Sequence, residues 1–175
     1  GLLFGVTLLV LCLLHGATFL ALKTGDPVRF RAQAFARWLR WAGVVVVLAS
    51  AAWTYQLSGR GALSVVLGLL AVLGSIAAVL LISGSRHGAA FAATAVTIGA
   101  TVASLFAGLY PNVLVSSTSA ANNLTIVGTA SSSYALTVMT WVAAVLFPVV
   151  LAYQTWSYIV FRRRVLVPAR ETVNA

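Results

Sequence analysis

Few side chains in the apolar parts of this sequence are of types that do chemistry. His15 and Met139 are residue types that serve as axial ligands of haem iron, and they lie in two different apolar stretches. A haem held by this pair is one interpretation. The other is that His15 makes a contact, either with a neighbouring helix or with a quinone or lipid headgroup. The single cysteine, Cys12, has no second cysteine for a disulfide or a CxxC metal site.

Charged groups are missing from the middle of every apolar stretch. Proton pumps and ion-coupled transporters place such groups at depth, where they are costly and therefore functional. We expect no carboxylate proton relay, no catalytic residue and no metal ligand in this chain. His87 follows Arg86 in a short turn and is expected to be solvated.

Composition indicates a protein dissolved in lipid. Of the 175 residues, 61% are hydrophobic and only 7% are charged, and the mean hydropathy is +1.03. A water-soluble domain has about a quarter charged residues. The net charge of +9 does not indicate a nucleic-acid binder, because the cations lie at the ends of apolar runs and form no basic face.

Five apolar stretches are each near the length of about 20 residues that a helix needs to cross a bilayer. They cover approximately residues 1–22, 38–57, 62–82, 89–110 and 134–161. Helix is expected in all five, because an open sheet edge has no hydrogen-bond partners in lipid. The fold class predicted is therefore all-α, a polytopic transmembrane bundle of five helices over residues 1–175.

The cations sort to one side of this bundle. Ten of the eleven lysines and arginines fall in the links 23–41, 84–88 and 162–175, and only Arg60 falls in a link on the other side. The positive-inside rule then places the C-terminus in the cytoplasm and the polar loop 111–133 outside. The sequence begins at Gly1 inside an apolar run, so we expect it to be the later part of a longer chain.

Small residues at helical spacing predict where helices approach closely. In the third stretch these are Gly68, Gly74 and Ala78, and in the fourth they are Gly99, Ala103 and Ala107. Pro148 removes one backbone donor from the fifth stretch and should kink it. A serine run at 131–133 is expected to cap that stretch.

Several motifs resemble subunit II of cytochrome bd-type quinol oxidases. They are HGATFLALKT at 15–24, LYPNVL at 109–114, LTI at 124–126, ASSSY at 130–134, LTVMTWVA at 136–143 and PVVLAYQTWSY at 148–158. They keep the family's order along the chain. The sequence departs from the family at Val115, where a proline is usual.

The resemblance implies that this chain forms the last five of about nine helices of a haem-free subunit. That subunit would stabilise a homologous subunit I. That partner would carry haems b and d, oxidise quinol and reduce O2 to water in a bacterial cytoplasmic membrane. Further partners implied are the N-terminal half of subunit II, membrane lipids and a small accessory subunit, with no nucleic acid. A small-solute transporter or a membrane scaffold without redox chemistry is the alternative, although only Pro148 interrupts a stretch and no polar cluster meets it.

Structural roles are expected for the residues of the later motifs. Pro111 and Asn112 should set the outer end of the fourth helix, Met139 and Trp141 should pack inside, and Pro148 should bend the fifth helix. A partner helix or a lipid tail should meet Tyr153, Gln154 and Trp156.

Overall fold

The computed structural model describes residues 1–57, 61–116 and 119–160, so predictions that involve Arg60 or residues 161–175 lie outside the described residues. Its elements are α1 (Leu2–Lys23), α2 (Val28–Leu57), α3 (Ala62–Ser83), α4 (His87–Leu109), β1 (Asn112–Leu114), a 3-10 turn η1 (Ala120–Asn122), β2 (Leu124–Thr125), α5 (Ile126–Thr129) and α6 (Ser133–Val160).

The described chain has five helices long and apolar enough to cross a membrane, namely α1, α2, α3, α4 and α6. This confirms the prediction of a polytopic helical membrane protein. Four of the five agree with the predicted stretches to within about two residues. The agreement follows from the bilayer itself, because its thickness sets the minimum length of an apolar helix.

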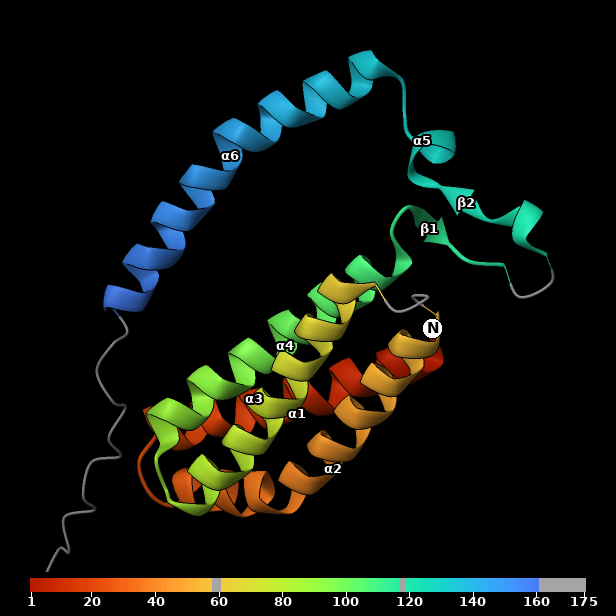
Figure 1. Ribbon diagram of the computed structural model, residues 1–175. Helices are drawn as coiled ribbons and strands as arrows, with labels where there is room; N and C mark the ends of the chain where they lie inside the picture. The colour runs from red at the N-terminus through yellow and green to blue at the C-terminus, as the bar shows by residue number, and fades with distance from the viewer. Residues whose placement is uncertain (58–60, 117–118, 161–175) are drawn as a thin grey trace, which may run out of the picture. The chain divides into compact units, whose positions relative to one another are not determined.

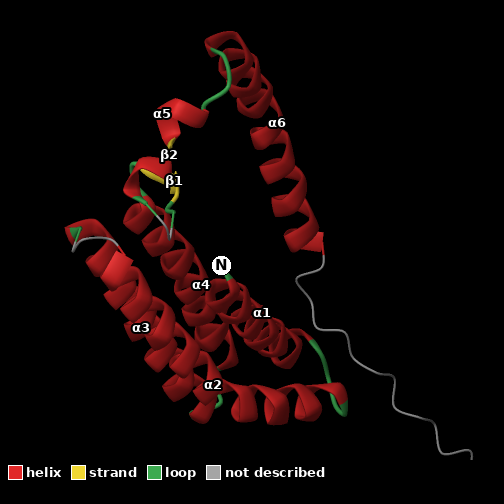
Figure 2. Cartoon of the chain, turned by 90° about the vertical axis from the view of Figure 1, so that its right-hand side faces the viewer, coloured by secondary structure: helices red, strands yellow, loops and turns green. Residues whose placement is uncertain are grey.

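Helix α2 begins ten residues earlier than predicted, at Val28 instead of residue 38. Its 30 residues correspond to about 45 Å of helix, which is longer than the hydrocarbon layer of about 30 Å. The additional turns are rich in arginine and aromatic residues, so hydropathy alone assigned them to a link. Figure 2 shows these first turns running across the end of the helix bundle.

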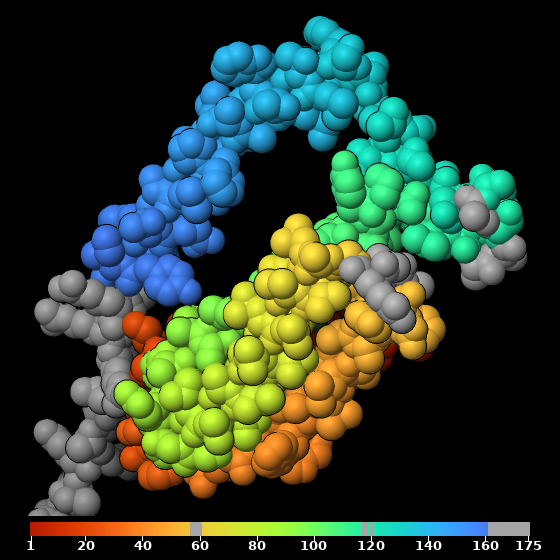
Figure 3. Space-filling view, viewed as in Figure 1, coloured from red at the N-terminus to blue at the C-terminus, as the bar shows by residue number. Residues whose placement is uncertain are grey.

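The chain divides into two compact units, and the first covers residues 1–110 of the described chain. In it α1 packs against α2 and α4, and α3 packs against the same two helices. The four helices thus form a closed bundle whose neighbours alternate in direction (Figure 1), and the space-filling view shows α2, α3 and α4 in continuous contact (Figure 3). Every lysine and arginine among the described residues lies at the end where α1 and α3 finish.

Hydroxyls and small residues fill the centre of this bundle. The buried polar side chains in the described part are all serine or threonine, and most of them donate to a carbonyl of their own helix. Gly74 lies so near α4 that an added Cβ would be 2.7 Å from Oγ1 of Thr97. The prediction of close approach through Gly68 and Gly74 is confirmed.

The corresponding prediction for α4 is wrong within this bundle. Gly99 and Ala103 are exposed, and a Cβ added at Gly99 would meet nothing within 4 Å. The inward face of α4 is instead formed by hydroxyl residues, namely Thr94, Thr97, Thr101 and Ser104. Both faces consist of small side chains at helical spacing, so spacing alone could not separate them.

The second unit contains the segment 111–133 and α6. The predicted polar loop has structure of its own, since β1 and β2 pair antiparallel with Asn112 opposite Thr125. This two-stranded ribbon departs from an all-α description of the chain. The amide of Ala135 lies 3.4 Å from Oγ of Ser132, so the serine run caps α6 as predicted.

Candidate functional site

His15 joins α1 to α4. Its Nδ1 lies 2.7 Å from Oγ1 of Thr94, and its ring stacks on Phe91 with centroids 4.3 Å apart. Thr94 donates its hydroxyl hydrogen to the carbonyl of Phe91 at 2.8 Å, so its oxygen accepts from Nδ1–H of His15. Phe19 adds a second ring 5.7 Å from Phe91. The interhelical contact weighed for His15 is therefore present in the structure.

His87 is not the solvated loop residue that the sequence suggested. It is the first residue of α4, it is half-buried, and its Nε2 lies 2.9 Å from Nε2 of Gln33 in α2. The prediction failed because residues 28–37 were assigned to a link, which hid the helix that packs beside His87. Nearby, Arg40 of α2 donates a hydrogen bond to Oγ of Ser83 in α3, at 2.6 Å.

At the opposite end, two serines hold α3 and α4 together. Ser64 donates to the carbonyl of Ser104 at 3.2 Å, and Ser104 donates to the carbonyl of Ser64 at 2.9 Å. Such reciprocal bonds satisfy both hydroxyls where water is absent. The bundle is thus tied by polar contacts at both ends and near His15.

The predicted structural residues of the second unit lie at the start of the ribbon and along α6. Helix α4 ends at Leu109, and the carbonyl of Pro111 accepts from the amide of Ile126 at 3.0 Å. Asn112 is the first residue of β1. That Pro111 and Asn112 set the end of α4 stays a prediction.

In α6 the helix continues through Pro148 as one element, and Figure 1 shows it as a curved rod. Tyr153, Gln154 and Trp156 are exposed, and the rings of the two aromatic residues lie 6.3 Å apart. Their contact with a partner helix or a lipid tail stays a prediction.

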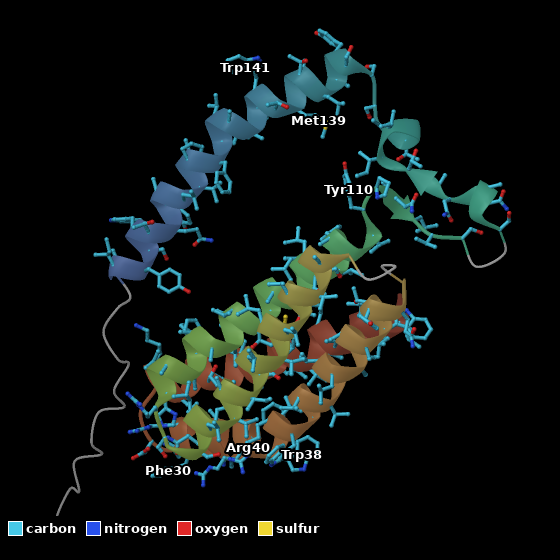
Figure 4. All side chains as sticks on the ribbon, in the orientation of Figure 1. Phe30, Trp38, Arg40, Tyr110, Met139 and Trp141 are labelled. Atoms are coloured by element: carbon cyan, nitrogen blue, oxygen red, sulfur yellow. The ribbon has the colours of Figure 1, made fainter. Side chains whose placement is uncertain are left out.

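Met139 and Trp141 are 64% and 71% exposed. They project from different sides of α6 in Figure 4, as expected for residues two positions apart in a helix. Helix α6 buries no residue within the structure. The expectation that Met139 and Trp141 pack inside therefore stays a prediction, as does a single bundle of all five helices.

Sequence reasoning missed the residues that His15 and His87 contact, namely Phe91, Thr94 and Gln33. The signal for Thr94 was present, because Thr94, Thr97, Thr101 and Ser104 repeat at intervals of three and four. Nothing comparable identified Gln33, since its importance depends on which helix its own helix packs against.

The described residues contain no group of three or more histidine, cysteine or acidic side chains that could hold a metal ion. The polar contacts described above hold the helices together. They are a histidine and threonine pair within the bundle, a glutamine and histidine pair at the basic end and a serine pair at the other end. The arrangement supports assembly and packing.

Comparison with known proteins gives one family. The sequence pattern of cytochrome bd terminal oxidase subunit II matches residues 1–161. A cytochrome bd ubiquinol oxidase subunit 2 from Bacillus subtilis (strain 168) is 37% identical over 165 residues, which cover 92% of this chain and 49% of that protein. A cytochrome bd-I ubiquinol oxidase subunit 2 from Escherichia coli (strain K12) is 27% identical, over 90% of this chain and 50% of that protein. The chain thus spans about half the length of the curated relatives it matches.

Proposed function

The chain belongs to the cytochrome bd terminal oxidase subunit II family, and from this premise we propose that it serves as a haem-free membrane part of a respiratory quinol oxidase. In this proposal a partner, subunit I, carries haems b and d, oxidises quinol and reduces O2 to water. The observation that carries the proposal is the family match over residues 1–161, which includes all five apolar helices of the described residues.

The haem-free role is supported by where the two candidate ligands lie. The ring of His15 is stacked on Phe91 and bonded through Nδ1 to Thr94, so it already links two helices. Met139 belongs to the other compact unit and is largely exposed. We propose that His15 serves as this structural contact between helices and that His15 and Met139 do not hold a haem as an axial pair.

A stabilising role is supported by the large apolar surface of the chain. Large apolar side chains are exposed along every long helix of the described residues. In a membrane such surface contacts either lipid or other helices. We propose that part of it packs against subunit I and against the remainder of subunit II, with lipid and a small accessory subunit over the rest.

The experiment is to tag the full-length protein, purify it from bacterial membranes in mild detergent and record a reduced-minus-oxidised spectrum. Bands of haems b and d should accompany the tagged chain, and the preparation should consume O2 with quinol. His15→Gln and Met139→Leu variants should keep all haem bands. A colourless preparation would favour the transporter or scaffold, and loss of one haem from an assembled variant would refute the haem-free role.

Orientation in the membrane is a separate part of the proposal. The cations sorted to one end of the first unit support a cytoplasmic basic end, a cytoplasmic C-terminus and an outer segment 111–133. In a cysteine-free background, Ser119→Cys should react with an impermeant maleimide in intact cells. Ala89→Cys should react only after permeabilisation. The same labelling pattern for both positions would overturn this topology.

A further inference from the structure

A groove runs between α1 and the first turns of α2, with a volume of about 420 Å³. This is within the range of roughly 300–1,000 Å³ typical of small-molecule sites. Its walls are apolar and include Leu13, Leu20 and Phe35, all of which are exposed. The groove is therefore apolar and lies open at the surface of the bundle.

Small residues form the floor of this groove. Ala17 and Ala32 are buried there, and Gly16 has open space around it, since an added Cβ would meet nothing within 4 Å. The part of α1 that lines the groove runs from Cys12 to Leu20, which corresponds to about 12 Å of helix. A hydrocarbon chain lying along α1 would fit this shape.

Among the described residues, Arg31 is the one charged residue that lines the groove, and it lies at the basic end of the bundle. Around it the first turns of α2 carry further arginines, whereas Asp26 is the one acidic residue among the described residues. The groove thus combines apolar walls with one cationic side chain. This is the charge pattern that attracts anionic lipid headgroups.

Exposed aromatic residues mark the depth at which Arg31 lies. Phe30 is 61% exposed and Trp38 is 76% exposed, and Figure 4 shows both at the same edge of the bundle as Arg40. The guanidinium of Arg40 lies 5.8 Å from the ring centre of Trp41. Tryptophan and arginine side chains together are typical of the headgroup layer.

We propose that this groove binds one anionic phospholipid, with its phosphate at Arg31 and an acyl chain along Leu13, Gly16 and Leu20. The basic turns of α2 then act as a lipid-binding segment that fixes the angle between α1 and α2. An uncharged isoprenoid tail or a protein helix would fill the apolar part but would leave Arg31 without an anion. That mismatch favours a phospholipid.

The test uses the full-length protein purified in detergent with the subunits that accompany it. The complex is stripped of loosely bound lipid and exposed to mixed micelles of phosphatidylglycerol or of phosphatidylcholine. Lipid retained per complex is then measured by phosphorus assay and mass spectrometry. Gly16→Leu fills the groove, and Gly5→Leu is its matched control, because Gly5 lies on the same helix and also has open space around it.

The wild type and Gly5→Leu should retain about one phosphatidylglycerol more than Gly16→Leu, with no such difference for phosphatidylcholine. Arg31→Gln should weaken retention about five-fold, the factor expected for one cation near a lipid phosphate, and Arg31→Lys should restore it. Arg37→Gln removes the same charge from the same helix without lining the groove, and it should retain lipid as the wild type does.

Equal lipid retention in Gly16→Leu and Gly5→Leu would overturn the proposal. Loss of a quinone instead of a phospholipid from Gly16→Leu would also overturn it. If Gly16→Leu fails to assemble while Gly5→Leu assembles, the groove is covered by protein and the proposal is wrong. In every case Arg31→Gln provides an independent test, because it removes the charge and does not fill the groove.

Discussion

Replacing Gly74 by alanine should push α3 and α4 apart. A Cβ at this position would lie 2.7 Å from Oγ1 of Thr97, whereas non-bonded heavy atoms prefer about 3.5 Å or more. The neighbour must therefore yield by about 0.8 Å. Thr97 is 1% exposed, and its hydroxyl is held by a 2.8 Å bond to the carbonyl of Ala93, so it has little freedom to move.

Overpacking of this kind costs about 1–3 kcal/mol of the free energy of unfolding. Alanine also favours a helix over glycine by about 1 kcal/mol, so the comparison needs a control without the clash. Gly99→Ala provides it, because a Cβ at Gly99 meets nothing within 4 Å. The difference between Gly74→Ala and Gly99→Ala should be about 1–3 kcal/mol, with Gly74→Ala the less stable.

The assay is equilibrium unfolding of the full-length protein in mixed micelles as the fraction of SDS rises, followed by tryptophan fluorescence. Thr97→Ala removes the clashing oxygen and should rescue Gly74→Ala in the double variant. Thr97→Ser keeps that oxygen and should not rescue it. Equal midpoints for Gly74→Ala and Gly99→Ala, or rescue by both substitutions of Thr97, would refute the reasoning.

Three further predictions follow from the polar contacts between helices. His15→Ala should lower the free energy of unfolding by about 0.6 kcal/mol and by no more than about 1.7 kcal/mol, the mean and the maximum measured for interhelical hydrogen bonds; loss of haem absorbance from an otherwise assembled complex would contradict this structural role. Gln33→Leu removes the contact between Nε2 of Gln33 and Nε2 of His87, and cysteine labelling at Ala89→Cys should be faster in this variant than with Gln33 present; an unchanged rate would show that the contact does not restrain α4. Ser64→Ala and Ser104→Ala should each cost about 0.6 kcal/mol, and the double-mutant cycle should show coupling, because the two serines are in contact and each bonds to the other residue's carbonyl; strict additivity would mean that the two bonds form independently.

The sequence alone determined how many helices are long enough to span a membrane and where most of them begin and end. It could do so because the thickness of the hydrocarbon layer sets a minimum length for an apolar helix, and each residue contributes to that length independently of its neighbours. The distribution of cations between the links was also determined by the sequence, because it is a count of the lysines and arginines in each link. The motifs at 15–24 and 136–158 were enough to indicate the family, which the comparison confirmed.

The tertiary structure decided which face of each helix is buried. Gly99 and Thr97 are both small residues at helical spacing, yet only Thr97 faces α3, because complementary shape across two helices selects one face. The partners of His15 and His87 depend on the same choice, since Thr94 and Gln33 are distant in sequence from the histidines they contact. Hydropathy measures transfer into lipid and has no term for which helix lies next to which, so these contacts required the fold.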